Sequence, residues 1–277
     1  MVLWVNSILL VSAPDRTNLD AAEQGDPEAQ TRLGVLYSEG QGVERSYETA
    51  AGWFLKAAEQ GSFDAQYNLG YLYDNGQGVD QSYREAAKWY RSAAEQGDIY
   101  AQNNLGDMYD SGQGVDQDFG EAAKWYRKAA DQGHAGAQNN LGFMYSNGLG
   151  VSKNEAEATK WVRKAAEQGF AEAQFNLGFM YFNGKGISKN EAEGVKWYRK
   201  AAEQGHVQAK FNLGFIYANG LGVPQEFVKA YMWWSIASAQ GHQDGAKFLD
   251  IIKKEMSHTQ IAEAQQLATE WWEKLSN

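Results

Sequence analysis

The stretch AAEQGSFDAQYNLGYLYDNGQGVDQSYREAAKWYRS occupies residues 57–92, and it recurs along the chain with a period of 36 residues. Its opening phrase, or a near copy, begins at residues 21, 57, 93, 129, 165, 201 and 237, without an insertion or a deletion. A fixed period of this length is the signature of a stacked array, in which each repeat contacts only its neighbours. The sequence therefore predicts a tandem-repeat protein rather than a globule with one central active site.

Each repeat predicts two helices. With Ala57 as position 1, positions 7–19 carry small and apolar residues at helical spacing, and we term this segment the A helix. A glycine-containing turn follows, and Ser82 at position 26 is a good N-cap for a second segment, the B helix. The B helix should end at Gly97, where a left-handed conformation carries no steric penalty. The predicted fold class is all-α, a solenoid of antiparallel helix pairs.

Recurring residues indicate scaffold. Tryptophan recurs at position 33 and tyrosine at position 17 in six repeats, so both are predicted to form core between adjacent repeats. Glycine recurs at position 14 inside the A helix, where it costs roughly 1 kcal/mol relative to alanine. The expected reason is a close approach of the B-helix backbone. His134, His206 and His242 at position 6 are expected to be solvated helix-start residues rather than metal ligands.

Composition narrows the function classes. The formal net charge is −10 and the pI is about 5.0, which argues against a nucleic-acid partner. The chain has no cysteine, so disulfides, thiol catalysis and cysteine-ligated zinc are excluded. No motif with metal-ligand or phosphate-loop spacing occurs, and the sequence predicts no enzyme, no cofactor and no metal site.

Residues 1–20 precede the repeats and form a predicted N-terminal extension or signal-peptide remnant. The apolar run at residues 2–11 is too short to span a bilayer, and no lysine or arginine precedes it. Cleavage after residue 13 would place the protein in the periplasm or outside the cell, whereas a packed extension would fit the cytoplasm. The sequence leaves both compartments open, and no other segment predicts an integral membrane span.

The pattern A-x-A-Q-x-N-L-G-x-x-Y-x-x-G-x-G-V, followed by E-A-x-x-W-Y-x-K-A-A-E-Q-G, resembles the Sel-one-like repeat, a relative of the tetratricopeptide repeat. The resemblance covers residues 21–241, as six repeats and the start of a seventh. It implies a right-handed superhelix of helix pairs and a role as adaptor or scaffold for other proteins. Bacterial members of the family are often exported and act in signalling, envelope or host-contact processes. Residues 242–277 depart from the pattern and predict an atypical C-terminal repeat with capping helices.

The resemblance also implies that the A helices line a concave groove. Position 12 faces this predicted groove and forms an asparagine ladder that is interrupted by Arg32 in the first repeat. The ladder could hold the backbone of an extended peptide, because a carboxamide both donates and accepts hydrogen bonds, or it could bond to the neighbouring repeat. Its members are Asn68, Asn104, Asn140, Asn176 and Asn212.

Positions 11 and 15 flank the ladder and vary between repeats, which favours a binding role. An exposed aromatic cluster usually marks a binding site, although a tight superhelix could bury the same side chains. Asp107 and Asp110 interrupt the aromatic strip with negative charge, which would suit a basic residue of the partner. The predicted partner-contacting aromatic residues are Tyr67, Tyr71, Phe143, Phe175, Phe179, Phe211 and Phe215.

The leading hypothesis is a non-enzymatic scaffold that binds a partner protein or an extended peptide. The alternative is an exported binder or hydrolase of a small ligand or cell-wall fragment, such as an envelope or host-contact factor. Calorimetry against peptidoglycan fragments separates these two hypotheses. Self-association through the ends of the array is a third hypothesis, and light scattering tests it.

Overall fold

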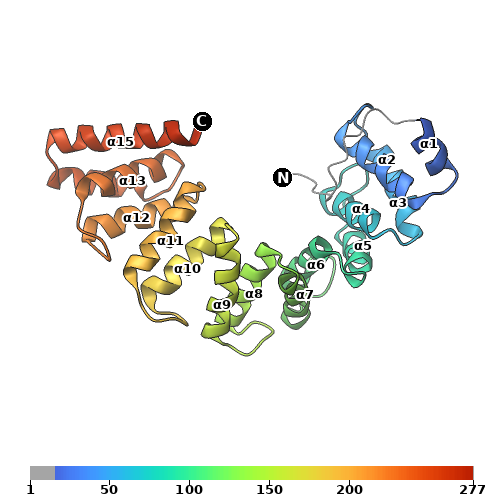
Figure 1. Cartoon of the computed structure of the whole chain (residues 1–277), viewed down its shortest axis with the longest axis horizontal. Helices are drawn as coiled ribbons and strands as arrows, with labels where there is room; N and C mark the ends of the chain where they lie inside the picture. Colours follow the sequence, from blue (N-terminus) through green and yellow to red (C-terminus); the bar gives the residue numbers. More distant parts are fainter. Residues whose placement is uncertain (1–15, 277) are drawn as a thin grey trace. The chain divides into compact units, whose positions relative to one another are not determined.

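The computed structural model describes residues 16–276, so the predicted cleavage region at residues 1–13 lies outside the described part. Every element within that part is helical, and the helices follow one another in packed pairs, which confirms the predicted all-α repeat class (Figure 1). The A helices are α2 (Pro27–Glu39), α4 (Phe63–Asn75), α6 (Ile99–Ser111), α8 (Ala135–Asn147), α10 (Ala171–Asn183) and α12 (Val207–Asn219). The B helices are α3 (Tyr47–Glu59), α5 (Tyr83–Glu95), α7 (Phe119–Asp131), α9 (Glu155–Glu167), α11 (Glu191–Glu203) and α13 (Phe227–Ala239).

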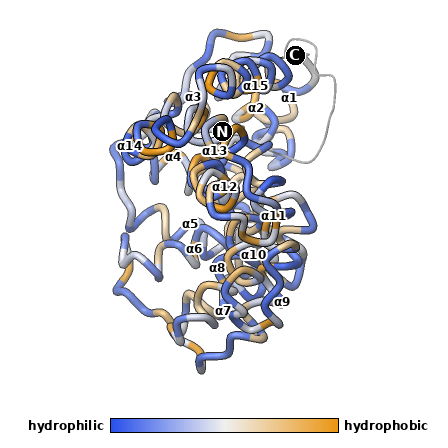
Figure 2. The backbone as a smooth tube through the Cα atoms, turned by 90° about the vertical axis from the view of Figure 1, so that its left-hand side faces the viewer, coloured by the Kyte–Doolittle hydropathy of each residue, from blue (hydrophilic) through white to orange (hydrophobic). Residues whose placement is uncertain are grey.

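The chain divides into two compact units. Within the described residues, the N-terminal unit comprises 16–137 together with 149–151, and the C-terminal unit comprises 138–148 and 152–276. In both units hydrophilic and hydrophobic residues alternate along the helices, as expected when each helix buries one face (Figure 2). No helix within residues 16–276 combines the length and the apolarity that crossing a bilayer requires.

The helices begin at the predicted caps. The Ser62 hydroxyl accepts a hydrogen bond from the backbone N–H of Ala65 at the start of α4, and the Ser82 hydroxyl accepts one from Glu85 at the start of α5. The A helices α2, α4, α6, α10 and α12 end at a glycine in the left-handed conformation, such as Gly76 at φ 64°. The regular spacing of these caps and glycines holds the helices at one length.

The glycine at position 14 serves a different contact from the one expected. A Cβ atom on Gly34 would lie 2.5 Å from the ring of Phe54, and one on Gly70 would lie 2.8 Å from the ring of Tyr90. The B helix therefore presents an aromatic side chain from position 34 to this glycine, rather than its backbone alone. In the fourth repeat Val162 takes the place of the aromatic ring, and the carbonyl of Ala158 also lies close to Gly142.

A ladder of glutamines connects successive repeats inside the N-terminal unit. Gln66 is buried and its Nε2 donates to the carbonyl of Ala58, while its Oε1 accepts from Gln96 Nε2 at 2.8 Å. The same two bonds recur around Gln30 and around Gln102. Each buried carboxamide thus satisfies a carbonyl near the end of one B helix and binds the glutamine that ends the next.

The recurring aromatic residues pack as the sequence predicts. Tyr37, Tyr73 and Trp89 lie against one cluster of buried residues, and Trp125 is part of the next. Several tryptophans are also covered by a lysine at position 36, such as Lys56 Nζ at 4.1 Å from the ring centre of Trp53. These contacts confirm that the tryptophan and tyrosine ladders belong to the core.

The C-terminal unit ends in three further elements, α14 (Gly245–Ile252), a short 3₁₀ helix (Lys253–Glu255) and α15 (His258–Ser276). The predicted capping box opens α15, because Ser257 N–H donates to Gln260 Oε1 at 2.9 Å and Gln260 N–H donates to Ser257 Oγ. Helix α15 packs against α13 (Figure 1), and Trp271 makes an edge contact with Trp233. Because α15 covers the last B helix, that apolar face is shielded from water.

Candidate functional site

Three phenylalanines at position 15 are exposed in consecutive repeats of the C-terminal unit. Phe143 on α8, Phe179 on α10 and Phe215 on α12 have exposed fractions of 57%, 41% and 46%. The contact between Asn176 Nδ2 and Asn139 Oδ1, at 3.0 Å, shows that α8 and α10 are neighbours. We term Phe143, Phe179 and Phe215 the exposed phenylalanine row. Large exposed apolar side chains at one repeat position form the type of surface that proteins use to contact partners.

The phenylalanines at position 11 are more enclosed. Phe175 stacks on His206 with ring centres 4.5 Å apart, and Phe211 stacks on His242 at 4.0 Å. The His206 Nδ1 also accepts the backbone N–H of Ala209 and thereby caps α12. His206 is therefore more than a solvated helix-start residue, since it caps α12 and covers the Phe175 ring, while His242 covers the Phe211 ring without capping a helix. Sequence reasoning missed this pairing between repeats, although a histidine at position 6 following a phenylalanine at position 11 signals it.

Three asparagines of the ladder form hydrogen bonds with other groups of the same chain. Asn68 is buried and donates to the carbonyl of Asp64 at 2.8 Å, and Asn176 donates to Asn139. Asn212 accepts from Gln208 Nε2 at 3.1 Å. Asn104 lies beside Asn103, and both Asn104 and Asn140 are partly buried. The role of this ladder in holding a peptide stays a prediction.

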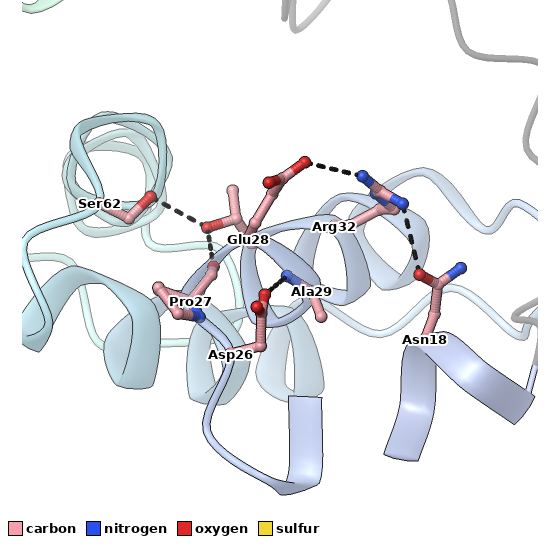
Figure 3. A network of polar contacts seen from close by, with 8 residues as sticks. Asn18, Asp26, Pro27, Glu28, Ala29, Arg32 and Ser62 are labelled. Atoms are coloured by element: carbon pink, nitrogen blue, oxygen red, sulfur yellow. Dashed lines mark hydrogen bonds and ion pairs between the residues drawn. The ribbon is translucent and has the colours of Figure 1, made fainter. Parts of the chain in front are cut away.

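Arg32 takes the ladder position in the first repeat. Its guanidinium donates to Glu28 Oε1 at 2.9 Å and to Asn18 Oδ1 at 3.3 Å, which connects α2 to α1 (Arg16–Glu23) (Figure 3). Asp26 caps the same helix through the N–H of Ala29 (Figure 3). The interruption of the ladder therefore has a local structural explanation at the N-terminal end of the array.

A pocket of about 700 Å³ lies in the N-terminal unit, between the A helices α4 and α6. Tyr67 and Tyr71 of the predicted site line it, and so does Asn104 of the ladder. Its volume lies within the range of about 300–1,000 Å³ that is typical of ligand sites. The pocket gathers the acidic residues Asp74, Asp107 and Asp110, and no lysine or arginine is among the described residues that line it.

Asp107 is held in place by two donors. The Tyr126 hydroxyl donates to its Oδ1 at 2.6 Å, and Asn103 Nδ2 donates to its Oδ2 at 2.9 Å. Although Asp107 is exposed, the surrounding pocket replaces part of its water, and this burial raises the pKa of the carboxyl above its ordinary value. The hydrogen bond from Tyr126 acts in the opposite direction. Burial also raises the pKa of Asp74 and of Asp110.

Tyr90 lies at the base of the same pocket. Its side chain is fully buried, and its hydroxyl makes no hydrogen bond to any residue in the described part of the chain. Asp74 and Asn104 are close enough to influence the pKa of this hydroxyl, but neither reaches it with hydrogen-bond geometry. Burial raises the pKa of Tyr90 well above its ordinary value, so the hydroxyl stays protonated and able to donate.

Six consecutive copies of the Sel1 repeat match the chain, at residues 27–62, 63–98, 99–134, 135–170, 171–206 and 207–242. The chain therefore belongs to the Sel1 repeat family, the Sel-one-like repeat proteins that its sequence resembles. The matched repeats each begin at the first residue of an A helix, such as residue 27. The repeat as defined from the sequence begins six residues earlier, at Ala21.

Solved structures give the same result. A protective antigen present in uropathogenic Escherichia coli strains, which displays an SLR fold, is 39% identical with a TM-score of 0.82. That alignment covers 94% of this chain and 55% of the antigen, so this chain spans about half of that protein. A Sel1 repeat protein from Oxalobacter formigenes is 34% identical with a TM-score of 0.71, over 82% of this chain and 98% of that one. No curated protein matches the chain.

The structure gives the predicted site residues two different settings. Tyr67, Tyr71 and Asn104 come together at the pocket of the N-terminal unit. Phe143, Phe179 and Phe215 are exposed on the A helices of the C-terminal unit. Sequence reasoning missed Tyr90, because the predicted partner contacts all lie on the A helix, whereas position 34 lies on the B helix. The signal that could have identified Tyr90 is the difference at position 34, where the first repeat has Phe54 and the second has a tyrosine with an added hydroxyl.

Proposed function

We propose that this chain is a protein-interaction scaffold and that the exposed phenylalanine row is one of its partner-binding surfaces. Sel1 repeat proteins are typically scaffolds of this kind and are generally not enzymes. The observation that carries the proposal is the exposure of Phe143, Phe179 and Phe215 at one position of three consecutive repeats. Phenylalanines exposed to water gain free energy when a partner covers them, at about 25 cal/mol for each Å² removed from water.

The partner of this row is expected to carry apolar side chains at a matching spacing. Lys185 Nζ lies 5.1 Å from the ring centre of Phe179, so the row also has a positive charge beside it. An apolar partner segment with a nearby acidic residue would fit both features. An asparagine of the ladder would contribute to partner binding only if its carboxamide exchanges its hydrogen bond within the chain for one to the partner.

The test replaces Phe179 by aspartate and compares the variant with wild type. Because Phe179 is exposed, we expect helicity and melting temperature to stay nearly unchanged, while binding of partners weakens about tenfold or more. The measurement is an affinity capture with quantitative mass spectrometry, followed by calorimetry with the purified partner. Loss of helicity in the variant would show that Phe179 belongs to the core and would contradict the proposal.

Leu55→Asp is the matched control. Leu55 is exposed on the B helix α3, so the change adds the same charge at a site outside the row. Partners that bind through the row are retained by Leu55→Asp and lost by Phe179→Asp. If both variants lose the same partners to the same extent, the loss is caused by the added negative charge and not by the row. That result would also contradict the proposal.

A further inference from the structure

We propose that the pocket of the N-terminal unit binds an arginine side chain of a partner protein. This inference rests on the proposed scaffold function and assigns a partner chemistry to a second part of the molecule. Its basis is a set of hydrogen-bond acceptors that lack donors, together with an unpartnered buried hydroxyl. The pocket lies wholly within the N-terminal unit, so its geometry does not depend on the C-terminal unit.

The pocket is rich in acceptors. The carboxylates of Asp74 and Asp110 form no ion pair with any residue between 16 and 276, and both line the pocket. Asp107 adds a third carboxylate to the pocket lining, which the bonds from Tyr126 and Asn103 hold in place.

Asn103 adds a further acceptor. Its Nδ2 donates to Asp107 Oδ2, and this bond fixes the orientation of the amide, because the opposite orientation would place two oxygens together. The Oδ1 atom of Asn103 is then buried without a donor among the described residues. An unsatisfied buried acceptor lowers stability, so a ligand that donates to it recovers free energy.

Tyr90 is the second, independent observation. Its fully buried hydroxyl makes no hydrogen bond within the described part of the chain, and Tyr90 contributes to the pocket lining. The equivalent residue in the first repeat is Phe54, so the packing against the A-helix glycine does not require the hydroxyl. A hydroxyl oxygen both donates and accepts hydrogen bonds, so the Tyr90 oxygen is able to accept one from a ligand.

An arginine side chain matches this set of groups. The guanidinium carries five N–H donors and no acceptor, and it stays positively charged beside the three aspartates. It is also planar and stacks on aromatic faces, which Tyr67, Tyr71 and Tyr100 supply around the pocket. A lysine ammonium provides charge but neither the fork of donors nor the flat surface.

The experiment titrates the full chain with three peptides that differ at one residue, acetyl-Gly-Gly-Xaa-Gly-Gly-amide with arginine, lysine or neutral citrulline. Isothermal calorimetry measures affinity, and two-dimensional NMR locates the response. We expect the arginine peptide to bind at least about tenfold more tightly than the citrulline peptide, since charge-assisted bonds are roughly twice as strong as neutral ones. Equal binding of citrulline would overturn the role of charge, and equal binding of lysine would overturn the arginine assignment.

Three variants separate the pocket from the rest of the surface. Asp74→Asn removes a pocket carboxylate and should weaken arginine binding about tenfold. Tyr90→Phe should keep the fold, as Phe54 does in the first repeat, and should also weaken binding. Asp116→Asn makes the same charge change on an exposed loop residue outside the pocket lining and should leave binding nearly unchanged. If Asp74→Asn and Asp116→Asn weaken binding of the arginine peptide equally, the loss of affinity comes from the change in net charge alone, and the proposal is overturned.

The two proposals fail separately. Phe179→Asp leaves the pocket intact, so that variant should still bind the arginine peptide with wild-type affinity. If the arginine peptide does not bind but Phe179→Asp still loses partners, the pocket assignment is wrong and the scaffold proposal stands. If the peptide binds and Phe179→Asp loses no partner, the row is not the partner surface.

Discussion

Position 14 of the repeat shows how one residue sets the distance between two helices. The ring at position 34 lies directly against the glycine, and Tyr198 repeats this contact with Gly178 in the C-terminal unit. Glycine is unfavourable inside a helix, so each such contact must supply more free energy than the backbone loses. A flat ring packed on a bare backbone does this through many short dispersion contacts.

Gly34 and Gly52 make a matched pair for testing this argument. Gly34→Ala would place a Cβ 2.5 Å from the Phe54 ring, and we expect it to lower the free energy of unfolding by about 1–3 kcal/mol. Gly52 lies in α3 with open space around its Cα, so Gly52→Ala should raise the free energy of unfolding by about 0.5–1 kcal/mol. Urea denaturation followed by circular dichroism measures both. Equal effects of the two variants would show that the ring contact is unimportant.

The residues at position 11 show what the sequence could not predict. The sequence predicts one aromatic strip that contains Phe175 and Phe211 as well as Phe179 and Phe215, because positions 11 and 15 both flank the asparagine ladder on the A helix. Exposure depends also on the next repeat, whose His206 and His242 cover the first two rings and leave the other two open. The predicted strip was thus a mixture of packed and exposed aromatic residues.

At the scale of the element, the sequence predicted the helices well because their ends carry local signals. The A helix expected at positions 7–19 of the second repeat is α4, Phe63–Asn75. The pocket was harder to predict, because it combines side chains from α4, α5 and α6. The sequence indicated Tyr67, Tyr71, Asn104 and the negative charge of Asp107 and Asp110, whereas the buried hydroxyl of Tyr90 depends on the packing of three helices.

The contact between α12 and α15 contains a buried lysine. Lys210 occupies the position that holds glutamine in the preceding repeats, and its Nζ donates to Gln240 Oε1 at 2.6 Å. The Trp271 ring centre lies 4.4 Å from Nζ, and Trp272 is near as well. Burial lowers the pKa of Lys210 from 10.5 to about 8, although the tryptophan rings favour the charged form.

We expect Lys210→Gln to raise the free energy of unfolding by about 1–3 kcal/mol at neutral pH, because it removes a buried charge. A glutamine there can also form the bonds of the glutamine ladder. Below about pH 8 the lysine is charged in both states, and the folded state carries the whole cost of burial. Between about pH 8 and 10.5 the unfolded state binds more protons than the folded state, so wild-type stability rises with pH.

The advantage of the variant should therefore shrink across that interval and vanish above about pH 10.5. Urea denaturation of wild type and Lys210→Gln at several pH values measures the difference between their free energies of unfolding. The other titrating groups are the same in both proteins, so their contributions cancel in this difference. Lys200→Gln is the control, since Lys200 is exposed on α11. A difference between Lys210→Gln and wild type that does not change with pH would contradict the assignment.

At the scale of the whole molecule, the period of 36 residues matters more than the identity of any repeat. The bonds that join repeats connect equivalent atoms, such as Gln66 to the Ala58 carbonyl and Gln102 to the Ala94 carbonyl. Removal of one full period brings Gln102 to the place of Gln66, opposite Ala58. The interface between repeats is then formed by the same residue types as before.

We expect deletion of residues 63–98 to leave a folded helical protein with a cooperative thermal transition. Deletion of residues 69–103 is the control, because it joins Asn68 to Asn104 and leaves one extra residue inside the A helix, which turns the rest of that helix by about 100° and moves apolar residues off the buried face. Circular dichroism and thermal unfolding distinguish the two. The first variant also loses Asp74 and Tyr90, so it should no longer bind the arginine peptide. Equal melting behaviour of both deletions would contradict the role of the period.

The glutamine ladder has a consequence for how such a chain can change over generations. Because the Gln–Gln join recurs between successive repeats up to the one that carries Lys210, unequal recombination in phase among those repeats yields a longer or shorter protein that still folds. The pocket and the exposed phenylalanine row lie in different repeats. Gain or loss of repeats can therefore add, remove or re-space recognition elements independently, without a redesign of the core.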